Sequence, residues 1–292
     1  MPSKDAVLVS RPDLTREPVA ASAFGVVQKP LSSTERIFDN AIVRKGLILV
    51  LLAVVWEIGA RTLNNELLFP TFLATLKALY QGLTGGALLS RIGSSLKVLL
   101  MGYGIGILLA GVFTAVGIAS RIGTDFLETV TAMFNPLPAI ALLPIALIWF
   151  GLGNGSLVFV LVHSVLWAVA LNTHSGFLAV SQTQRMVGRN YGLSGFAYVT
   201  RILIPAAFPS ILTGLKIGWA FAWRTLIASE LVFGVSSGSG GLGWYIYENK
   251  NELDIPNVFA GLLTVILIGL VIENLVFRTL ENHTVRKWGM QA

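Results

Sequence analysis

The stretch MVGRNYGLSGFAYVTRILIP, from Met186 to Pro205, separates two apolar segments that are each long enough to cross a bilayer. Gly192 and Ser194 predict a break between two short helical pieces. Apolar and basic side chains on such pieces can dock into a groove of another protein. The candidate docking surface comprises Met186, Val187, Gly188, Arg189, Gly192, Leu193, Ser194, Phe196, Tyr198, Val199, Arg201 and Pro205. The alternative interpretation is an ordinary positively charged loop.

Two prolines mark the end of this stretch. Pro205 and Pro209 predict that one helix ends and the next begins, because proline lacks a backbone N–H and is tolerated in a first helical turn. A further apolar segment then runs from about Ser210 to Phe233.

The composition indicates an integral membrane protein. Of 292 residues, 54% are hydrophobic and 12% are charged, whereas soluble domains have about 25% charged residues. The apolar runs are long and do not alternate, which favours membrane helices over a β-barrel. The sequence has no cysteine, which excludes disulfides, cysteine metal ligands and thiol catalysis. The first 45 residues show no signal-peptide pattern.

The pattern predicts an all-α protein with six transmembrane helices. We expect them at about residues 46–63, 93–119, 127–150, 156–177, 210–233 and 258–280. Residues 67–83 form an amphipathic piece that is too short to cross. In the second span, Gly102 and Gly106 make a small-residue face for close helix packing.

The third span is expected to be broken or kinked. Its proline-rich sequence frees backbone carbonyls, which is tolerable only where protein or a water-filled cavity satisfies them. The residues are candidates for a gate: Asn135, Pro136, Pro138 and Pro144. The alternative is a fixed kink packed by neighbouring helices.

The distribution of basic residues predicts the orientation in the membrane. Six spans place both termini on one side. The basic residues on that side include Arg36, Arg44, Lys45, Arg121, Arg185, Arg189, Arg201, Arg278, Arg286 and Lys287. Arg61, Lys77, Arg91 and Lys250 fall on the other side. The termini and the docking surface are therefore expected in the cytoplasm. The net charge of +6 reflects this topology rather than nucleic-acid binding.

These expectations divide the chain into three parts. Residues 1–45 form a cytoplasmic arm, 46–285 the transmembrane domain with its loop at about 181–205, and 286–292 a cytoplasmic tail. Most of the arm is expected to be flexible. Ser32 to Glu35 could cap a short surface helix that contains Ile37, Phe38, Ile42 and Val43.

Ionisable side chains inside a bilayer are costly and usually face a cavity or a partner. Arg224 is the best candidate for binding an anion, because its forked donors suit an oxyanion. The alternative is that Arg224 pairs with Glu230 or Glu57 and holds the helices together. His163, Glu230 and Trp223 are further pathway candidates, with interhelical packing as the alternative role.

The loop resembles the cytoplasmic loop of the membrane subunits of bacterial ABC importers. That family has Glu-Ala-Ala, three residues, Gly, nine residues, Ile, one residue and Leu-Pro. Here Gly192, Ile202 and Pro205 match, Ile204 replaces the leucine, and Met186 stands where the family has its acidic residue.

From about Leu68 to Lys287 the chain is similar to the permeases of the nitrate, sulfonate and taurine branch of these importers, of the type I permease fold. The similarity includes the blocks Asn135–Ala139, Leu142–Pro144, Trp149–Gly153, Pro205–Pro209, Thr213–Lys216, Ala228–Glu230 and Gly240–Gly243. Because Met186 stands where the family has an acidic residue, the salt bridge that this acid would offer to the ATPase cannot form here. Arg185 or Arg189 could replace it with an inverted charge pattern.

The resemblance implies an assembly of two copies of this chain, two cytoplasmic ATPase subunits and a periplasmic or lipid-anchored substrate-binding protein in the bacterial inner membrane. It implies transport of a small anion, such as a sulfonate, taurine or nitrate. The chain itself is not expected to be an enzyme, because it lacks the motif G-x-x-x-x-G-K-[ST]; Gly151 to Gly155 has no lysine. ATP and Mg²⁺ would be bound by the partner ATPase.

No metal site is expected, because the three histidines, His163, His174 and His283, are far apart in sequence. Two alternatives stay open. One is an ion-driven secondary transporter, which would require paired broken helices in an internal repeat. The other is an ABC permease for a neutral small molecule.

Overall fold

The computed structural model describes residues 39–233, 240–287 and 289. Contacts divide the chain into two units, one ending at Leu52 and the other beginning at Ala53. The predicted cap at Ser32 to Glu35, with Ile37 and Phe38, lies outside the described residues. The helix α2 (Ala41–Leu63) coincides with the first predicted span and begins before the expected end of the arm at residue 45.

The all-α prediction is confirmed for the described residues, which form helices joined by short connections. The helices of the second unit after α2 are α3 (Phe72–Thr84), α4 (Ala87–Ala119), α5 (Arg121–Phe134), α6 (Leu143–Phe150), α7 (Asn154–Leu178), α8 (Gln182–Asn190), α9 (Gly195–Tyr198), α10 (Ile204–Phe233), α11 (Leu242–Asn251), α12 (Ile255–Val271) and α13 (Arg278–Glu281). Short 3₁₀ or π-helical turns link several of them at Ala139–Leu142, Val199–Leu203, Ile272–Phe277 and Asn282–Arg286.

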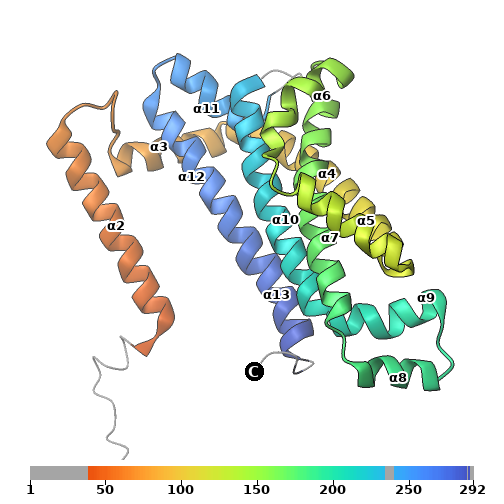
Figure 1. Ribbon diagram of the computed structural model, residues 1–292. Helices are drawn as coiled ribbons and strands as arrows, with labels where there is room; N and C mark the ends of the chain where they lie inside the picture. Colours follow the sequence, from red (N-terminus) through yellow and green to blue (C-terminus); the bar gives the residue numbers. More distant parts are fainter. Residues whose placement is uncertain (1–38, 234–239, 288, 290–292) are drawn as a thin grey trace, which may run out of the picture. The chain divides into compact units, whose positions relative to one another are not determined.

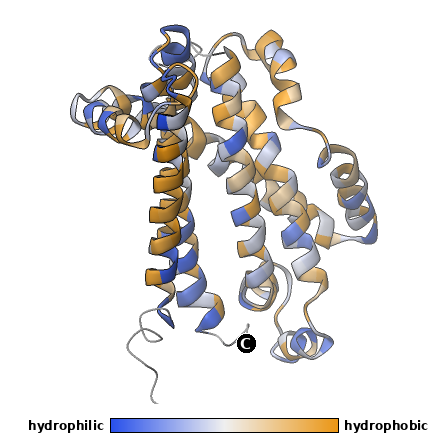
Figure 2. Ribbon diagram, turned by 90° about the vertical axis from the view of Figure 1, so that its left-hand side faces the viewer, coloured by the Kyte–Doolittle hydropathy of each residue, from blue (hydrophilic) through white to orange (hydrophobic). Residues whose placement is uncertain are grey.

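Among the described residues, four helices are long and apolar enough to cross a membrane: Ala87–Ala119, Asn154–Leu178, Gly195–Val232 and Ile255–Arg286. A fifth span results if the bent pair Arg121–Phe134 and Ala139–Phe150 is one crossing. Apolar residues cover the middle of the long helices and hydrophilic residues gather toward their ends (Figure 2). The first predicted span, which coincides with α2, stays a prediction as a membrane crossing.

Helix α7 is the most buried of these spans, and α4 and α10 pack along it (Figure 1). The predicted glycine face of α4 is confirmed, since Gly102 and Gly106 both lie against α7. A Cβ atom on Gly102 would lie 2.5 Å from Leu161 Cβ, and one on Gly106 would lie 2.6 Å from Val165 Cβ. The two helix backbones can approach this closely only because the glycines have no side chain.

The third span is broken, as predicted, and the break is sharp. α5 and the segment Ala139–Phe150 meet at 86°. The break lies at residues 135–138, where the two prolines and the C-cap Asn135 interrupt the helix. Pro144 is also among the predicted kink residues, but it lies in the first turn of α6. A backbone N–H in the first turn has no intrahelical acceptor, so the proline does not interrupt the helix there.

The prediction that Pro205 and Pro209 end one helix and start the next is wrong. The chain is helical without interruption from Gly195 to Val232. Pro205 is the second residue of α10 and Pro209 lies inside it. The π-helical turn at Val199–Leu203 directly precedes these prolines, and such a turn shifts the backbone hydrogen bonds by one residue.

We predict that Gly106→Leu lowers the melting temperature of the detergent-purified protein. The new side chain would collide with Val165 in the buried contact between α4 and α7, and overpacking of this kind costs about 1–3 kcal/mol. Gly104→Leu is the matched control, because a Cβ on Gly104 would have nothing within 4 Å. Equal melting temperatures for the two variants would contradict the role of this contact.

Candidate functional site

The break in the third span lies beside α7 and α10, and the three segments line an open cavity of about 370 Å³. One wall of the cavity is formed by the prolines of the break and the residues that follow them. The other walls are formed by one face of α7 and by α10. The lining residues are Asn135, Pro136, Leu137, Pro138, Ala139, Ile140, His163, Ser164, Trp167, Phe221, Arg224, Thr225 and Ala228. The structure thus brings together the predicted anion residue, one histidine candidate and three of the four gate candidates.

The lining contains one arginine, Arg224, and no lysine. The side chain of Arg224 is exposed. Its Nε donates to the carbonyl oxygen of Ala220 at 3.0 Å, and its Cζ lies 5.3 Å from the centre of the Phe221 ring. Within the described part of the chain, no carboxylate forms an ion pair with Arg224. The guanidinium therefore has donors available for a ligand.

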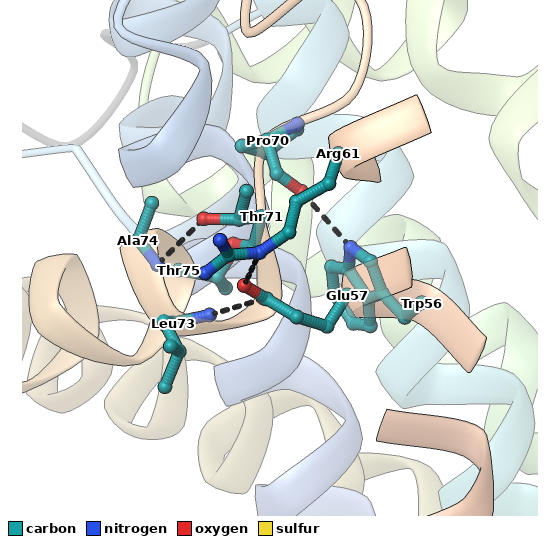
Figure 3. Close-up of polar contacts among 8 residues, drawn as sticks. All are labelled: Trp56, Glu57, Arg61, Pro70, Thr71, Leu73, Ala74 and Thr75. Atoms are coloured by element: carbon teal, nitrogen blue, oxygen red, sulfur yellow. Dashed lines mark hydrogen bonds and ion pairs between the residues drawn. The ribbon is translucent and has the colours of Figure 1, made fainter. Parts of the chain in front are cut away.

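Glu57, one of the two alternative partners of Arg224, has other contacts (Figure 3). Its Oε1 accepts a hydrogen bond from Arg61 Nε at 2.7 Å, and its Oε2 accepts one from the backbone N–H of Leu73 at 3.2 Å. The neighbouring Trp56 donates its indole N–H to the carbonyl oxygen of Pro70 at 3.0 Å. These contacts fasten the end of α2 to the start of α3.

Glu230, the other alternative partner, is also occupied elsewhere. Its side chain is buried, with 4% exposure. Both carboxylate oxygens lie 2.8 Å from Ser95 Oγ, and the backbone N–H of Gly243 donates to Oε2 at 2.8 Å. Ser95 Oγ in turn accepts the backbone N–H of Leu242 at 2.7 Å. Glu230 joins the ends of α10 and α11 to α4 and does not line the cavity.

The helix that follows this junction is held by a second polar pair. The hydroxyl of Tyr245 donates to Asn257 Oδ1 at 2.8 Å, which links α11 to α12. Burial raises the pKa of the Tyr245 phenol, and the charge of Asp254 raises it further. The hydroxyl therefore stays protonated and remains a donor at physiological pH.

His163 and Trp167 lie on the cavity-lining face of α7, one helical turn apart. Neither ring nitrogen of His163 has a hydrogen-bond partner, and neither does the indole N–H of the buried Trp167. Sequence reasoning selected His163 but missed Trp167, Ser164 and Thr225. The i, i+4 spacing of His163 and Trp167 is the signal that could have found the tryptophan.

Trp223, the remaining pathway candidate, does not line the cavity. It is buried in the core, and the position of a Cβ on Gly269 of α12 would lie 4.0 Å from its Nε1. Its alternative role in helix packing fits the structure.

The candidate docking surface consists of α8 and α9, joined by a turn at Tyr191 to Ser194. The predicted break is present, since Gly192 adopts the left-handed conformation with φ 70°. Figure 1 shows α8 and α9 at one end of the helical bundle and α6 and α11 at the other. Several of its apolar side chains are exposed: Met186, Val187, Tyr191 and Phe196.

Gly188 is the buried member of this surface. A Cβ atom there would lie 2.9 Å from both Ile202 Cγ1 and Tyr198 Cε2. The glycine lets α8 pack directly against the start of the long helix. The exposed side chains of the two segments therefore belong to one compact surface.

The two arginines of α8 have different roles. Arg185 donates to the carbonyl oxygens of Phe177 at 2.6 Å and Val180 at 3.1 Å, so it caps the C-terminal end of α7. Arg189 is exposed. Arg189 is therefore the better of the two candidates for the inverted charge pattern.

A second cavity, of about 920 Å³, lies between the docking surface and the neighbouring parts of α4, α7 and α10. Residues of α4, α7 and the segment after Gly195 line it, including Thr114, Val169, Phe196, Tyr198 and Leu203. The described residues contain no group of three or more His, Asp or Glu side chains that could hold a metal ion.

Residues 102–286, more than half of the chain, match the family model described as "Binding-protein-dependent transport system inner membrane component". The chain belongs to this family. The matched range includes the cavity, the docking surface and Glu230, whereas its partner Ser95 precedes the range. The cavity and the docking surface therefore lie within the permease domain.

Curated relatives agree with this assignment. The permease is 30% identical to a relative from Methanocaldococcus jannaschii whose name describes an ABC transporter permease, with 82% of this chain and 90% of the relative covered. It is 28% identical to the taurine transport system permease protein TauC of Escherichia coli, with 82% and 86% covered. It is 29% identical to the nitrate import permease protein NrtB of Synechocystis, with 82% and 88% covered.

A solved structure, the crystal structure of an amino acid ABC transporter with histidines, matches the fold with a TM-score of 0.50. The sequences are 20% identical, and the match covers 72% of this chain and 97% of the solved one. The likeness shows that the arrangement of helices is that of an ABC transporter permease.

The protein is thus a multi-pass inner-membrane permease component of an ABC importer and not itself an ATPase. Family membership implies ATPase subunits and a substrate-binding protein as partners. The missing phosphate-binding motif agrees with a separate ATPase chain.

We predict that Glu230→Ala lowers the free energy of unfolding of the permease by about 1–3 kcal/mol, because the Gly243 N–H and the Ser95 hydroxyl lose a buried acceptor. Glu230→Gln keeps one acceptor oxygen and is expected to fall between this variant and the wild type. Thermal melting in detergent measures the effect. Glu252→Ala removes an exposed carboxylate from the end of α11 and is the control. A Glu230→Ala protein as stable as this control would contradict the anchoring role.

Proposed function

We propose that this permease forms the translocation pathway for a small anion and couples it to ATP hydrolysis through α8 and α9. The cavity at the broken span carries the proposal. Arg224 lines it, and none of its described lining residues is acidic. A cation without a protein counter-ion in a membrane cavity favours a negatively charged ligand.

The place of Arg224 in the bundle fits a pathway residue. It lies 20 residues after Ile204, about 30 Å along the helix at 1.5 Å per residue. The docking surface is at the opposite end of this helix. The cavity wall formed by residues 135–138 is non-helical backbone, which is found at membrane depth where it is buried in protein or lines a water-filled space.

The uninterrupted helix from Gly195 to Val232 supports coupling between these two places. Its first turns carry Phe196 of the docking surface, and its later turns carry Arg224. A movement imposed on Phe196 by an ATPase can displace the arginine through one rigid element, so no separate relay is required.

The proposed assembly contains two copies of the permease, two ATPase subunits and one substrate-binding protein. α2 then serves as the sixth span, both termini lie in the cytoplasm, and the docking surface faces the ATPases. The names of TauC and NrtB, taurine and nitrate permeases, support an anion or a sulfonate as the substrate. The ion-driven alternative predicts paired broken helices, whereas the described residues contain one bent pair.

We predict that Arg224→Gln reduces anion-stimulated ATPase activity of the reconstituted complex by about tenfold to a hundredfold. A hydrogen bond to a charged group contributes about 1.5–3 kcal/mol, and 1.4 kcal/mol corresponds to a factor of ten. Arg224→Lys keeps the charge but loses the forked donors and is expected to be intermediate. Arg121→Gln removes another exposed arginine that does not line the cavity, and it is the control. Unchanged stimulation in Arg224→Gln would contradict the proposal.

We predict that Phe196→Ser weakens association with the ATPase subunits without destabilising the permease. The ring is 83% exposed, so its loss removes little internal packing but deletes an apolar docking contact. Co-purification and the melting temperature are measured together. Leu152→Ser, at a residue that is 78% exposed near α6 at the other end, is the control. Full co-purification of the Phe196 variant would exclude this residue from the docking contact.

A further inference from the structure

The second cavity is a long groove whose extent along the helices matches one leaflet of a bilayer. On α4 its lining follows a single helical face: Ile107, Gly111, Thr114, Ala115, Ile118 and Ala119. The helix rises about 18 Å between the first and the last of these residues, and half of a hydrocarbon core of about 30 Å is about 15 Å. On the opposite side the lining runs from Leu203 to Leu215, a similar helical length. An extended chain that lies parallel to the helices therefore fits the groove.

Gly111 keeps this groove open. A Cβ atom on Gly111 would have nothing within 4 Å, whereas one on Gly106 would collide with Val165 of α7. Gly111 therefore does not serve the contact between α4 and α7, and it is exposed on the groove side. Most of the other lining residues are apolar, including Val169 and Phe177. Such a surface favours hydrocarbon over water.

The groove is basic at the end beside the docking surface (Figure 1). Arg185 and Arg189 of α8 are the charged residues of its described lining, and none of the described lining residues is acidic. Within the described part of the chain, no carboxylate forms an ion pair with either arginine. Arg185 caps α7, whereas Arg189 is exposed. Basic residues at a membrane surface attract anionic lipids, so this end fits a phosphate head group.

Thr114 adds a polar group between the basic end and the deeper apolar part. Its side chain is 2% exposed, and its hydroxyl has no hydrogen-bond partner among the described residues. It lies five residues before Ala119, about 8 Å deeper along the helix. A buried hydroxyl needs a partner. The ester carbonyls of a glycerophospholipid lie between its phosphate and its acyl chains and can accept this hydrogen bond. The groove thus offers a cation, a donor and hydrocarbon in the order in which such a lipid presents its parts.

We infer that the groove binds one anionic glycerophospholipid from the leaflet next to the docking surface, with its phosphate at Arg189 and an acyl chain along α4. Phe196 and Tyr198 line the same groove and belong to the docking surface, so the bound lipid contacts that surface from the membrane side. The inference rests on the proposed function only in placing α8 and α9 at the cytoplasmic leaflet.

Three probes separate the head group from the acyl chains. Dioleoylphosphatidylglycerol is the expected ligand. Dioleoylphosphatidylcholine has the same chains and a zwitterionic head group, and glycerol 3-phosphate has the anionic phosphate without chains. The permease is purified with its ATPase subunits, freed of bound lipid and titrated with each probe in native mass spectrometry. This method resolves both the number of bound lipids and the number of permease copies in each complex.

We expect the wild-type complex to bind phosphatidylglycerol at least about tenfold more tightly than phosphatidylcholine, and glycerol 3-phosphate not to compete with it. Arg189→Gln should reduce the preference for phosphatidylglycerol by about fivefold, because one basic residue fewer attracts the head group. Arg121→Gln removes another exposed arginine that does not line the groove and should preserve the preference.

Filling the groove tests the apolar part of the site. Gly111→Leu should weaken the binding of both phospholipids by about tenfold, because its side chain takes the place of part of the acyl chain. Gly104→Leu is the matched control, since a Cβ on Gly104 also has nothing within 4 Å but Gly104 does not line the groove. Both variants should keep the melting temperature of the wild type. Thr114→Val removes the hydroxyl and should weaken both phospholipids equally.

Three results would overturn the inference. Equal phosphatidylglycerol binding by Gly111→Leu and Gly104→Leu would reject the groove as the lipid site. Equal affinity of the wild type for the two phospholipids, or competition by glycerol 3-phosphate, would reject an anionic lipid as the ligand. A loss of permease copies from the Gly111→Leu complex would show that a second copy covers the groove instead.

These results are independent of the anion pathway, because the titration contains no transported anion and leaves Arg224 unchanged. Failure of the lipid site therefore leaves the proposed pathway intact. Conversely, unchanged ATPase stimulation in Arg224→Gln would reject the pathway and leave the lipid site intact.

Discussion

The close contact of α7 with α4 on one side and α10 on the other is the constraint on which the bundle depends. In a lipid environment apolar helices gain little from leaving their surroundings, so association depends on packing and on small residues that let backbones approach. α4 presents Gly102 and Gly106 to α7, and α10 presents Gly214 and Gly218. A Cβ atom added at any of these four glycines would lie closer to an α7 atom than ordinary van der Waals contact allows. This packing fixes the positions of the side chains that α7 and α10 turn toward the broken third span.

The cavity follows from that arrangement. A helix broken at residues 135–138 leaves backbone groups and a gap that a straight helix would fill, and His163, Trp167 and Arg224 from the two adjacent helices line the gap. The same break supplies the apolar wall. Polar and apolar functions therefore come from different elements: the firmly packed helices place the donors, and the irregular segment places the hydrocarbon surface.

The helix from Gly195 to Val232 runs from the candidate docking surface to the cavity, as the proposed coupling requires. At the docking end, Gly188 and the Arg185 cap hold α8 against this helix and against the end of α7. At the other end, Glu230 holds its last turns to α4 and α11. Both ends of the helix are thus fastened to neighbours, which supports the proposed coupling between the docking surface and Arg224.

The sequence by itself determined the membrane class, the four long helical spans, the glycine face of α4, the break at residues 135–138 and the turn at Gly192, because each of these depends on composition, periodicity or backbone chemistry within one segment. Only the tertiary structure decided the partners of the charged side chains. Glu230 binds Ser95, 135 residues away in sequence, and leaves Arg224 without a described carboxylate partner. Pro205 likewise does not end its helix; it lies in the first turn of α10, directly after a π-helical turn. Contacts between distant segments depend on how whole helices pack, and no local pattern encodes that packing.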